Sequence, residues 1–158
     1  MPNFLLIISC IAVALMVGGG IFEGLVIVPQ FKADPPRSFR IIQKDTGVPL
    51  QRFWIPVHIF ITLALAGAVL ANWKFPVRRV FVLIAILSYV VMRLWSGFYF
   101  IREMLRFQKV PLESEPSTEL LHRVKRWSTL TWFRKPLDFI TLICLLFALN
   151  LPGSFGCT

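Results

Sequence analysis

Four long apolar runs dominate this sequence and limit the folds that the chain can adopt. They cover about residues 4–28, 54–73, 80–101 and 132–151. About 20 apolar residues in a helix cross the roughly 30 Å hydrocarbon layer of a bilayer. Hydrophobic residues make up 56% of the chain, and its mean hydropathy of +0.71 favours lipid as the main solvent. We therefore predict an all-α fold, a four-transmembrane-helix bundle that forms a single domain over residues 1–158.

Polar connectors separate these runs. The second run has a tryptophan at each end, Trp54 and Trp73, as is typical of residues at the two membrane interfaces. Before the last run, Leu120, Val124 and Trp127 recur at helical spacing. This spacing predicts an amphipathic interfacial helix before the last span, or a helix that leads directly into that span.

Basic residues indicate how the bundle is oriented. The positive-inside rule places basic connectors in the cytoplasm, and here the basic excess falls on connectors 30–52 and 102–131, whereas the opposite side carries Lys74, Arg78 and Arg79. We expect both connectors to be cytoplasmic and both termini to lie on the non-cytoplasmic side of a plasma or inner membrane. The net charge of +9 then suits anionic headgroups, so the expected partner is the lipid bilayer and not nucleic acid.

Each predicted span carries one ionisable side chain in the same half of the membrane. At about 1.5 Å of rise per residue, Glu23 lies about 9 Å and Arg93 about 13 Å inside the cytoplasmic ends of their spans. His58 and Asp138 lie about 6 Å inside theirs. Ionisable residues in membrane spans almost always face the bundle interior. We therefore expect these four side chains to gather in the cytoplasmic half.

Arg93 needs a counter-ion, because a lone arginine near the centre of a span costs about 2.5 kcal/mol or more. Glu23 is the first candidate and Asp138 the second. The pair could be structural and specify packing, or it could be functional, with Glu23, His58 and Arg93 as catalytic groups. His58 is more simply interpreted as a hydrogen-bonded helix residue than as a ligand, because no second histidine lies in a span at similar depth.

Two further patterns have ordinary structural interpretations. Arg134 and Lys135 lie at the start of the last apolar run, and we expect their side chains to extend to the headgroups. Gly20 and Gly24 are four residues apart in the first span, a spacing that lets a neighbouring helix approach closely.

No metal site or cofactor is predicted. The cysteines Cys10, Cys144 and Cys157 form no C-x-x-C pair, and the sequence has no phosphate-binding loop or zinc-protease motif. Haem ligation by His58 is the one cofactor possibility left open. An absorption spectrum would test it.

Several segments resemble the anthrone-oxygenase-like family of small four-helix integral membrane proteins, much of which has no assigned function. The matching residues are Gly20-Ile21-Phe22-Glu23-Gly24 leading to Pro29, Phe98-Tyr99-Phe100 with Glu103, and Arg126-Trp127 followed by Arg134. The resemblance implies a four-helix membrane bundle and, by analogy with some relatives, oxygenation of a lipophilic polycyclic phenolic substrate. It also implies Glu23, Tyr99, Glu103, Trp127 and Arg134 as lining residues, and the depth argument adds Asp138.

A different class of function fits the same features. A small chain with short outer connections and a glycine-lined first helix could be an accessory subunit of a larger membrane complex, or a homo-oligomer. Such a subunit would stabilise the complex or hold lipid, pigment or quinone. An enzyme should be active alone in detergent, whereas a subunit should purify with its partners.

Overall fold

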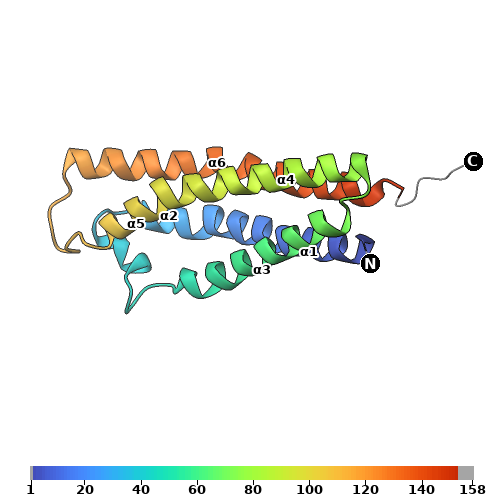
Figure 1. Ribbon diagram of the computed structural model, residues 1–158. Coiled ribbons are helices and arrows are strands. Elements are labelled where there is room, and N and C mark those ends of the chain that lie inside the picture. Colours follow the sequence, from blue (N-terminus) through green and yellow to red (C-terminus); the bar gives the residue numbers. More distant parts are fainter. Residues whose placement is uncertain (1, 153–158) are drawn as a thin grey trace, which may run out of the picture.

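The structure is a computed structural model that describes residues 2–152, and helices are the regular elements of this part of the chain. Four helical columns run side by side (Figure 1). In chain order they are α1 (Pro2–Phe22) continued by η1 (Glu23–Ile27) and α2 (Val28–Phe31); α3 (Leu50–Ala71); α4 (Pro76–Trp95) continued by η3 (Ser96–Ile101) and α5 (Arg102–Phe107); and α6 (Thr118–Asn150). The all-α prediction is confirmed for the described residues.

The columns pack around a shared apolar core. Column α1 packs on both α3 and α6, and α4 packs closely on α6, whereas α3 and α4 touch each other much less. Buried side chains from every column meet in the core: Leu6, Val13, Ile61, Val82 and Leu145. The sparse contact between α3 and α4 leaves room between these two helices.

Three of the columns are long and apolar enough to cross a membrane: Pro2–Phe31, Leu50–Ala71 and Pro76–Phe107. The first and third are longer than the predicted spans 4–28 and 80–101. Proline at position 29 does not end the first helix, because Pro29 occupies the first turn of α2, where no backbone N–H is needed. A membrane crossing by α6 stays a prediction.

Helix α6 is one continuous helix from Thr118 to Asn150. Its first turn is capped by Ser117, whose side chain accepts a hydrogen bond from the backbone N–H of Leu120 at 3.1 Å. Pro136 lies inside the helix without ending it. The residues predicted as an interfacial helix are thus the first turns of α6 and form no separate element, which corrects that prediction in favour of its alternative.

Two short π-helical segments interrupt the columns, η1 at Glu23–Ile27 and η3 at Ser96–Ile101. In η1 the Val28 N–H bonds to the carbonyl of Glu23, five residues earlier. The Phe100 carbonyl in η3 accepts a hydrogen bond from the Trp127 indole at 3.3 Å. Such wide turns often occur at functional sites, and each segment here begins with a polar residue.

The first connector folds onto the bundle as a 3-10 helix, η2 (Arg37–Ile42). Its Phe39 is fully buried, and its ring lies 5.0 Å from that of Phe31 and 5.3 Å from that of Phe107. Trp127 of α6 closes the same cluster, 5.3 Å from Phe31. We call this side of the molecule, which carries connectors 32–49 and 108–117, the connector end.

Arg78 holds the opposite end of the bundle together. It is 2% exposed, although the sequence suggested an ordinary charge in a turn. Its guanidinium donates to Asn3 Oδ1 at 2.7 Å and, through Nε, to the Leu151 carbonyl at 3.0 Å. A further contact of 3.5 Å reaches Asn72 Oδ1. The starts of α1 and α4 and the ends of α3 and α6 therefore meet at one side chain, and we call this side the terminal end.

We expect Arg78→Met to destabilise the bundle. The substitution keeps an apolar stem but removes the charged donor to the Leu151 carbonyl and to Asn3 Oδ1, at a cost of about 1.5–3 kcal/mol, the usual contribution of a hydrogen bond to a charged group. Thermal unfolding in detergent, followed by circular dichroism, measures the effect. Arg79→Met is the matched control, because Arg79 is less buried, donates only to the nearby Trp73 carbonyl at 3.2 Å and lies over the Trp73 ring. Equal losses in the two variants would contradict the role given to Arg78.

Candidate functional site

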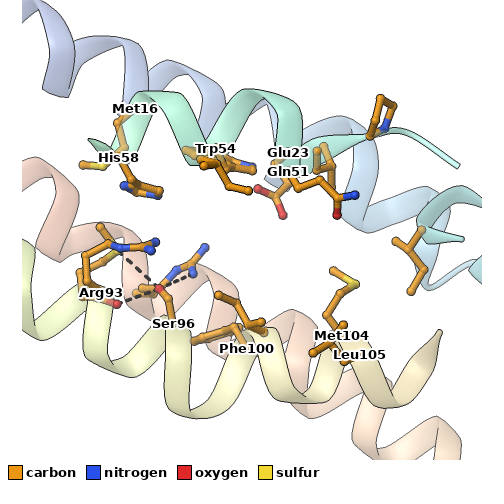
Figure 2. Close-up of a pocket in the computed structure, with 18 of the residues that line it drawn as sticks. Met16, Glu23, Gln51, Trp54, His58, Arg93, Ser96, Phe100, Met104 and Leu105 are labelled. Carbon is orange, nitrogen blue, oxygen red and sulfur yellow. Dashed lines mark hydrogen bonds between the residues drawn. The ribbon is translucent and has the colours of Figure 1, made fainter. Parts of the chain in front are cut away.

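A cavity of about 680 Å³ lies between the columns in their connector-end half. Its walls come from α1, α3, the α4–η3–α5 column and α6, with part of the first connector at its rim. Figure 2 shows side chains of α3 facing those of α4 and α5 across this space. Because α3 packs mainly on α1, the cavity occupies the room between α3 and α4.

The structure brings the ionisable residues of the four columns together around this cavity. Glu23 of η1, His58 of α3, Arg93 of α4 and Asp138 of α6 all line it. These four side chains start at similar depths in their helices, which is why they lie around the same cavity. Apolar and aromatic side chains make up most of the remaining wall: Met16, Trp54, Met92, Phe100, Met104 and Trp127.

The predicted ion pair between Arg93 and Glu23 is not formed. Within residues 2–152, the ion pairs that the structure contains involve Glu103, with Arg106 at 2.5 Å and with Arg123 at 2.8 Å. The Arg93 guanidinium lines the cavity, and no carboxylate in the described chain lies within 4.0 Å of it. Nor does this side chain make a hydrogen bond there. Arg93 is thus a cation in an apolar helix without a protein counter-ion in contact.

Glu23 is instead faced by cations of α6. Arg134 and Lys135 are the positive charges that act most strongly on its carboxylate, and Trp54 lies beside it. Lys135 is 7% exposed and its ammonium donates a hydrogen bond to the Gly20 carbonyl. Helices α1 and α6 thus share a buried layer of charge.

Arg134 does not extend to the headgroups either. Its Nη1 donates to Ser96 Oγ at 2.8 Å, and its guanidinium lies over the Phe100 ring, 4.6 Å from the centroid. It also lines the cavity. The expectation of headgroup contact was therefore wrong for both Arg134 and Lys135, because α6 continues through this region and turns both side chains inward.

His58 is held by Tyr89 and Thr62. The Tyr89 hydroxyl donates to the His58 carbonyl at 3.1 Å and lies 3.2 Å from Nδ1 of the same histidine. Thr62 Oγ1 lies 3.3 Å from the Tyr89 hydroxyl. Thr62 Oγ1 also donates to the His58 carbonyl at 2.8 Å. Two hydroxyl groups thus hold the backbone and the ring of His58, whose imidazole lines the cavity.

Asp138 is buried and incompletely hydrogen bonded. It is 8% exposed, and its Oδ1 has no hydrogen-bond partner in the described part of the chain. Arg134 Nε is likewise buried without an acceptor there. Buried polar atoms are nearly always paired, so such exceptions are informative. Both atoms belong to side chains that line the cavity, and a polar ligand or water could satisfy them.

The resemblance named two residues that the structure places elsewhere. Glu103 is tied to Arg106 and Arg123 and joins α5 to α6, and Tyr99 lies under Arg126, 5.7 Å from its guanidinium. Neither lines the cavity. Trp127 does line it. Of the five lining residues implied by the resemblance, Glu23, Trp127 and Arg134 therefore lie at the cavity, and Tyr99 and Glu103 lie outside it.

Three residues of the site were not identified as site residues from the sequence. Tyr89 and Ser96 belong to a polar stripe on the third span, and their spacing of three or four residues from Arg93 placed them on its face. Lys135 gave no comparable signal, because its place beside Pro136 resembled the start of a span. Of the residues searched, 2–152, no group of three or more His, Cys, Asp or Glu side chains could hold a metal ion.

We expect Gly24→Val to disturb the buried charge layer. A Cβ atom at Gly24 would lie 3.0 Å from Lys135 Cε and 3.2 Å from Trp132 Cζ2, so both side chains would have to move. Overpacking of this kind lowers stability by about 1–3 kcal/mol. Gly18→Val is the control, because a Cβ at Gly18 meets no heavy atom within 4 Å. The midpoint of thermal unfolding should be lower for Gly24→Val than for Gly18→Val. Identical midpoints would contradict this packing.

Comparison with known proteins identifies no relative that would help to interpret this site. The chain matches no protein-family model, no curated protein and no solved structure. Its function is therefore inferred from the cavity and its charges.

Proposed function

We propose that this chain is an integral membrane protein that binds a lipophilic aromatic molecule with an acidic group in the cavity, and that it oxygenates this molecule. The proposal depends on one observation. The Arg93 guanidinium lines the cavity from an apolar helix, and no carboxylate of residues 2–152 contacts it. A buried cation of this kind is stabilised when an anionic group reaches it.

The balance of charge around the cavity supports an anionic ligand. Apart from the exposed rim residue Lys44, the cavity is lined by the cations Arg93 and Arg134, and Lys135 acts on Glu23 from behind the wall; Glu23 and Asp138 carry two negative charges when ionised. One added anion would balance these five groups. A low local dielectric strengthens its attraction to Arg93.

The remaining wall suits a flat, apolar body. Trp54, Phe100 and Trp127 line the cavity together with methionine side chains from α1, α4 and α5. Aromatic faces stack on planar ligands, and methionine adapts to irregular shapes. A volume of about 680 Å³ lies within the range of small-molecule sites, about 300–1,000 Å³.

Two groups could accept a proton from such a ligand. Glu23 lies at the start of η1 and His58 on α3, and both lie across the cavity from Arg93 (Figure 2). Removal of a proton from an acidic C–H or phenol leaves an anion, which Arg93 would hold. This assignment follows the family resemblance for Glu23 and the geometry for His58 and Arg93.

Oxygenation requires dioxygen as the co-reactant and oxidant. The carbanion formed at an acidic methylene transfers electrons to dioxygen and, with return of the proton, gives a hydroperoxide. Loss of water then breaks the O–O bond and leaves a carbonyl, so CH₂ and O₂ become C=O and H₂O. In this scheme the protein supplies the base and the cation that stabilises the intermediate anion.

We expect Arg93→Gln to weaken binding of an acidic aromatic probe selectively. Anthracene-9-carboxylate should lose about tenfold or more in affinity, because a hydrogen bond to a charged group contributes about 1.5–3 kcal/mol. Anthracene-9-methanol has a similar size without the charge, so its affinity should stay the same. Probe fluorescence in detergent measures both. Arg102→Gln is the control, because Arg102 is exposed and does not line the cavity; equal weakening of acid and alcohol would contradict the role of Arg93.

We expect Glu23→Gln and Arg93→Leu to lower the rate of anthrone oxygenation by about 100-fold or more, the usual contribution of a general base or an anion-stabilising group. Dioxygen consumption and anthraquinone formation by the purified protein, corrected for the uncatalysed reaction, measure the rate. Arg102→Leu should be unaffected. Unchanged turnover of every tested substrate by Arg93→Leu would argue against this mechanism.

Purification of the wild-type chain distinguishes this proposal from the alternative, an accessory subunit of a larger membrane complex. An enzyme of this kind should keep its turnover as an isolated chain in detergent. Stoichiometric co-purification with other membrane proteins, together with absence of turnover, would favour an accessory subunit that uses the cavity to hold lipid, pigment or quinone. A Soret band would indicate haem at His58.

A further inference from the structure

One side of the cavity is bordered by apolar side chains that are also exposed on the outside of the bundle. On α3 these are Ile55, Ile59 and Leu63, and on the facing column they are Ile101 and Leu105. Ile59 is 57% exposed and Ile101 is 47% exposed. A residue that lines a cavity and is also exposed lies at its mouth. The mouth is therefore between α3 and the η3–α5 part of the third column.

The mouth lies alongside the apolar part of the helices. Counted from the span ends predicted above, Ile59 lies about 8 Å inside Trp54, and Ile101 is the last residue of the span 80–101. Both helices are long and apolar enough to span a membrane. The outside of α3 at Ile59 would therefore contact acyl chains, and Ile101 marks the connector-end edge of the mouth.

The packing of the helices explains why the mouth is on this side. Column α1 packs on α3 and α6, and α6 packs on α4, so three sides of the bundle are closed by helix–helix contact. Contact between α3 and α4 is sparse. In Figure 2 the space between α3 and the α4–α5 column continues past His58 and Arg93 toward Met104 and Leu105.

We propose that the cavity opens sideways into the bilayer between α3 and the η3–α5 segment, and that its ligand is a membrane-dissolved amphipathic acid that reaches Arg93 by this route. The inference rests on the proposed function, because it takes the ligand to bind in the same cavity. The acidic group passes inward to Arg93, while the apolar body remains between Ile59 and Ile101.

The charges of the wall agree with this direction of access. The mouth itself is apolar, whereas the cationic groups Arg93 and Arg134 and the imidazole of His58 lie on the cavity wall behind it. An acid that partitions into the bilayer meets an apolar opening first and a cation afterwards. The acid would pass this opening in its protonated, uncharged form, because an unpaired charge is costly in an apolar environment, and it would ionise beside Arg93.

A second route would lead from the water at the connector end. Gln43, Lys44, Val48 and Gln51 line the cavity at that end, and Lys44 and Gln51 are exposed. A water-soluble ligand would use this rim. The two routes are bordered by different residues, so substitutions can separate them.

The experiment measures uptake of anthracene-9-carboxylate from phosphatidylcholine vesicles into the reconstituted protein, read from the emission of the directly excited probe. Ile59→Trp and Ile101→Trp enlarge the side chains at the lateral mouth. Gln51→Trp narrows the connector-end rim. Phe60→Trp is the control, because Phe60 is the next residue on α3, is 51% exposed and does not line the cavity.

We expect Ile59→Trp and Ile101→Trp to slow uptake about tenfold relative to Phe60→Trp, with Gln51→Trp close to the control. Slower uptake in Gln51→Trp, with normal rates in the two mouth variants, would overturn the lateral route. Rates equal to the control in all variants would overturn it as well. The proposed function fails in a distinguishable way, because the wild-type protein would then bind no probe. Circular dichroism of each variant confirms that the bundle remains folded.

Discussion

The hydrogen bond from Lys135 to the Gly20 carbonyl is the contact on which the arrangement of the site depends. It joins α6 to α1 inside the bundle, where Gly24 leaves room for the lysine: a Cβ atom at Gly24 would lie 3.0 Å from Lys135 Cε. With Lys135 held there, its neighbour Arg134 points to Ser96 of η3. Helix α6 thereby connects the first and third columns through adjacent cations. The cavity lies between these columns and α3, which packs mainly on α1.

The fold and the depth of the site follow from features that a sequence displays directly. The length of the apolar runs predicts membrane-spanning helices. A constant rise per residue then gives the position of Glu23, His58, Arg93 and Asp138 along the helix axes. Height does not give the direction in which a side chain points around the bundle. For this reason the four residues share a cavity, yet Arg93 and Glu23 do not pair. Tertiary packing of α3 and α6 sets that direction.

The irregular turns explain the other differences. A polar stripe at regular helical spacing joins Tyr89, Arg93, Ser96 and Phe100 to Glu103, and the first four line the cavity. The π-helical turn of η3 changes the number of residues per turn, so Glu103 falls on another face, where Arg106 and Arg123 bind it. Likewise, Arg134 and Lys135 lie at the start of the last predicted span, where basic side chains usually extend to the headgroups. Their inward direction depends on the packing of the continuous helix α6 and could not be predicted from their place in the span.

The length of α6 has a mechanical consequence. Its 33 residues extend over about 50 Å, so a substantial part of the helix would project beyond a hydrocarbon layer of about 30 Å. Pro136 cannot donate a backbone hydrogen bond to the turn before it, which makes this point the natural hinge of the rod. Arg134 and Asp138 lie on either side of the hinge. A force on the projecting turns that bends α6 at Pro136 would therefore change the distance between the Arg134 guanidinium and the Asp138 carboxylate in the cavity wall.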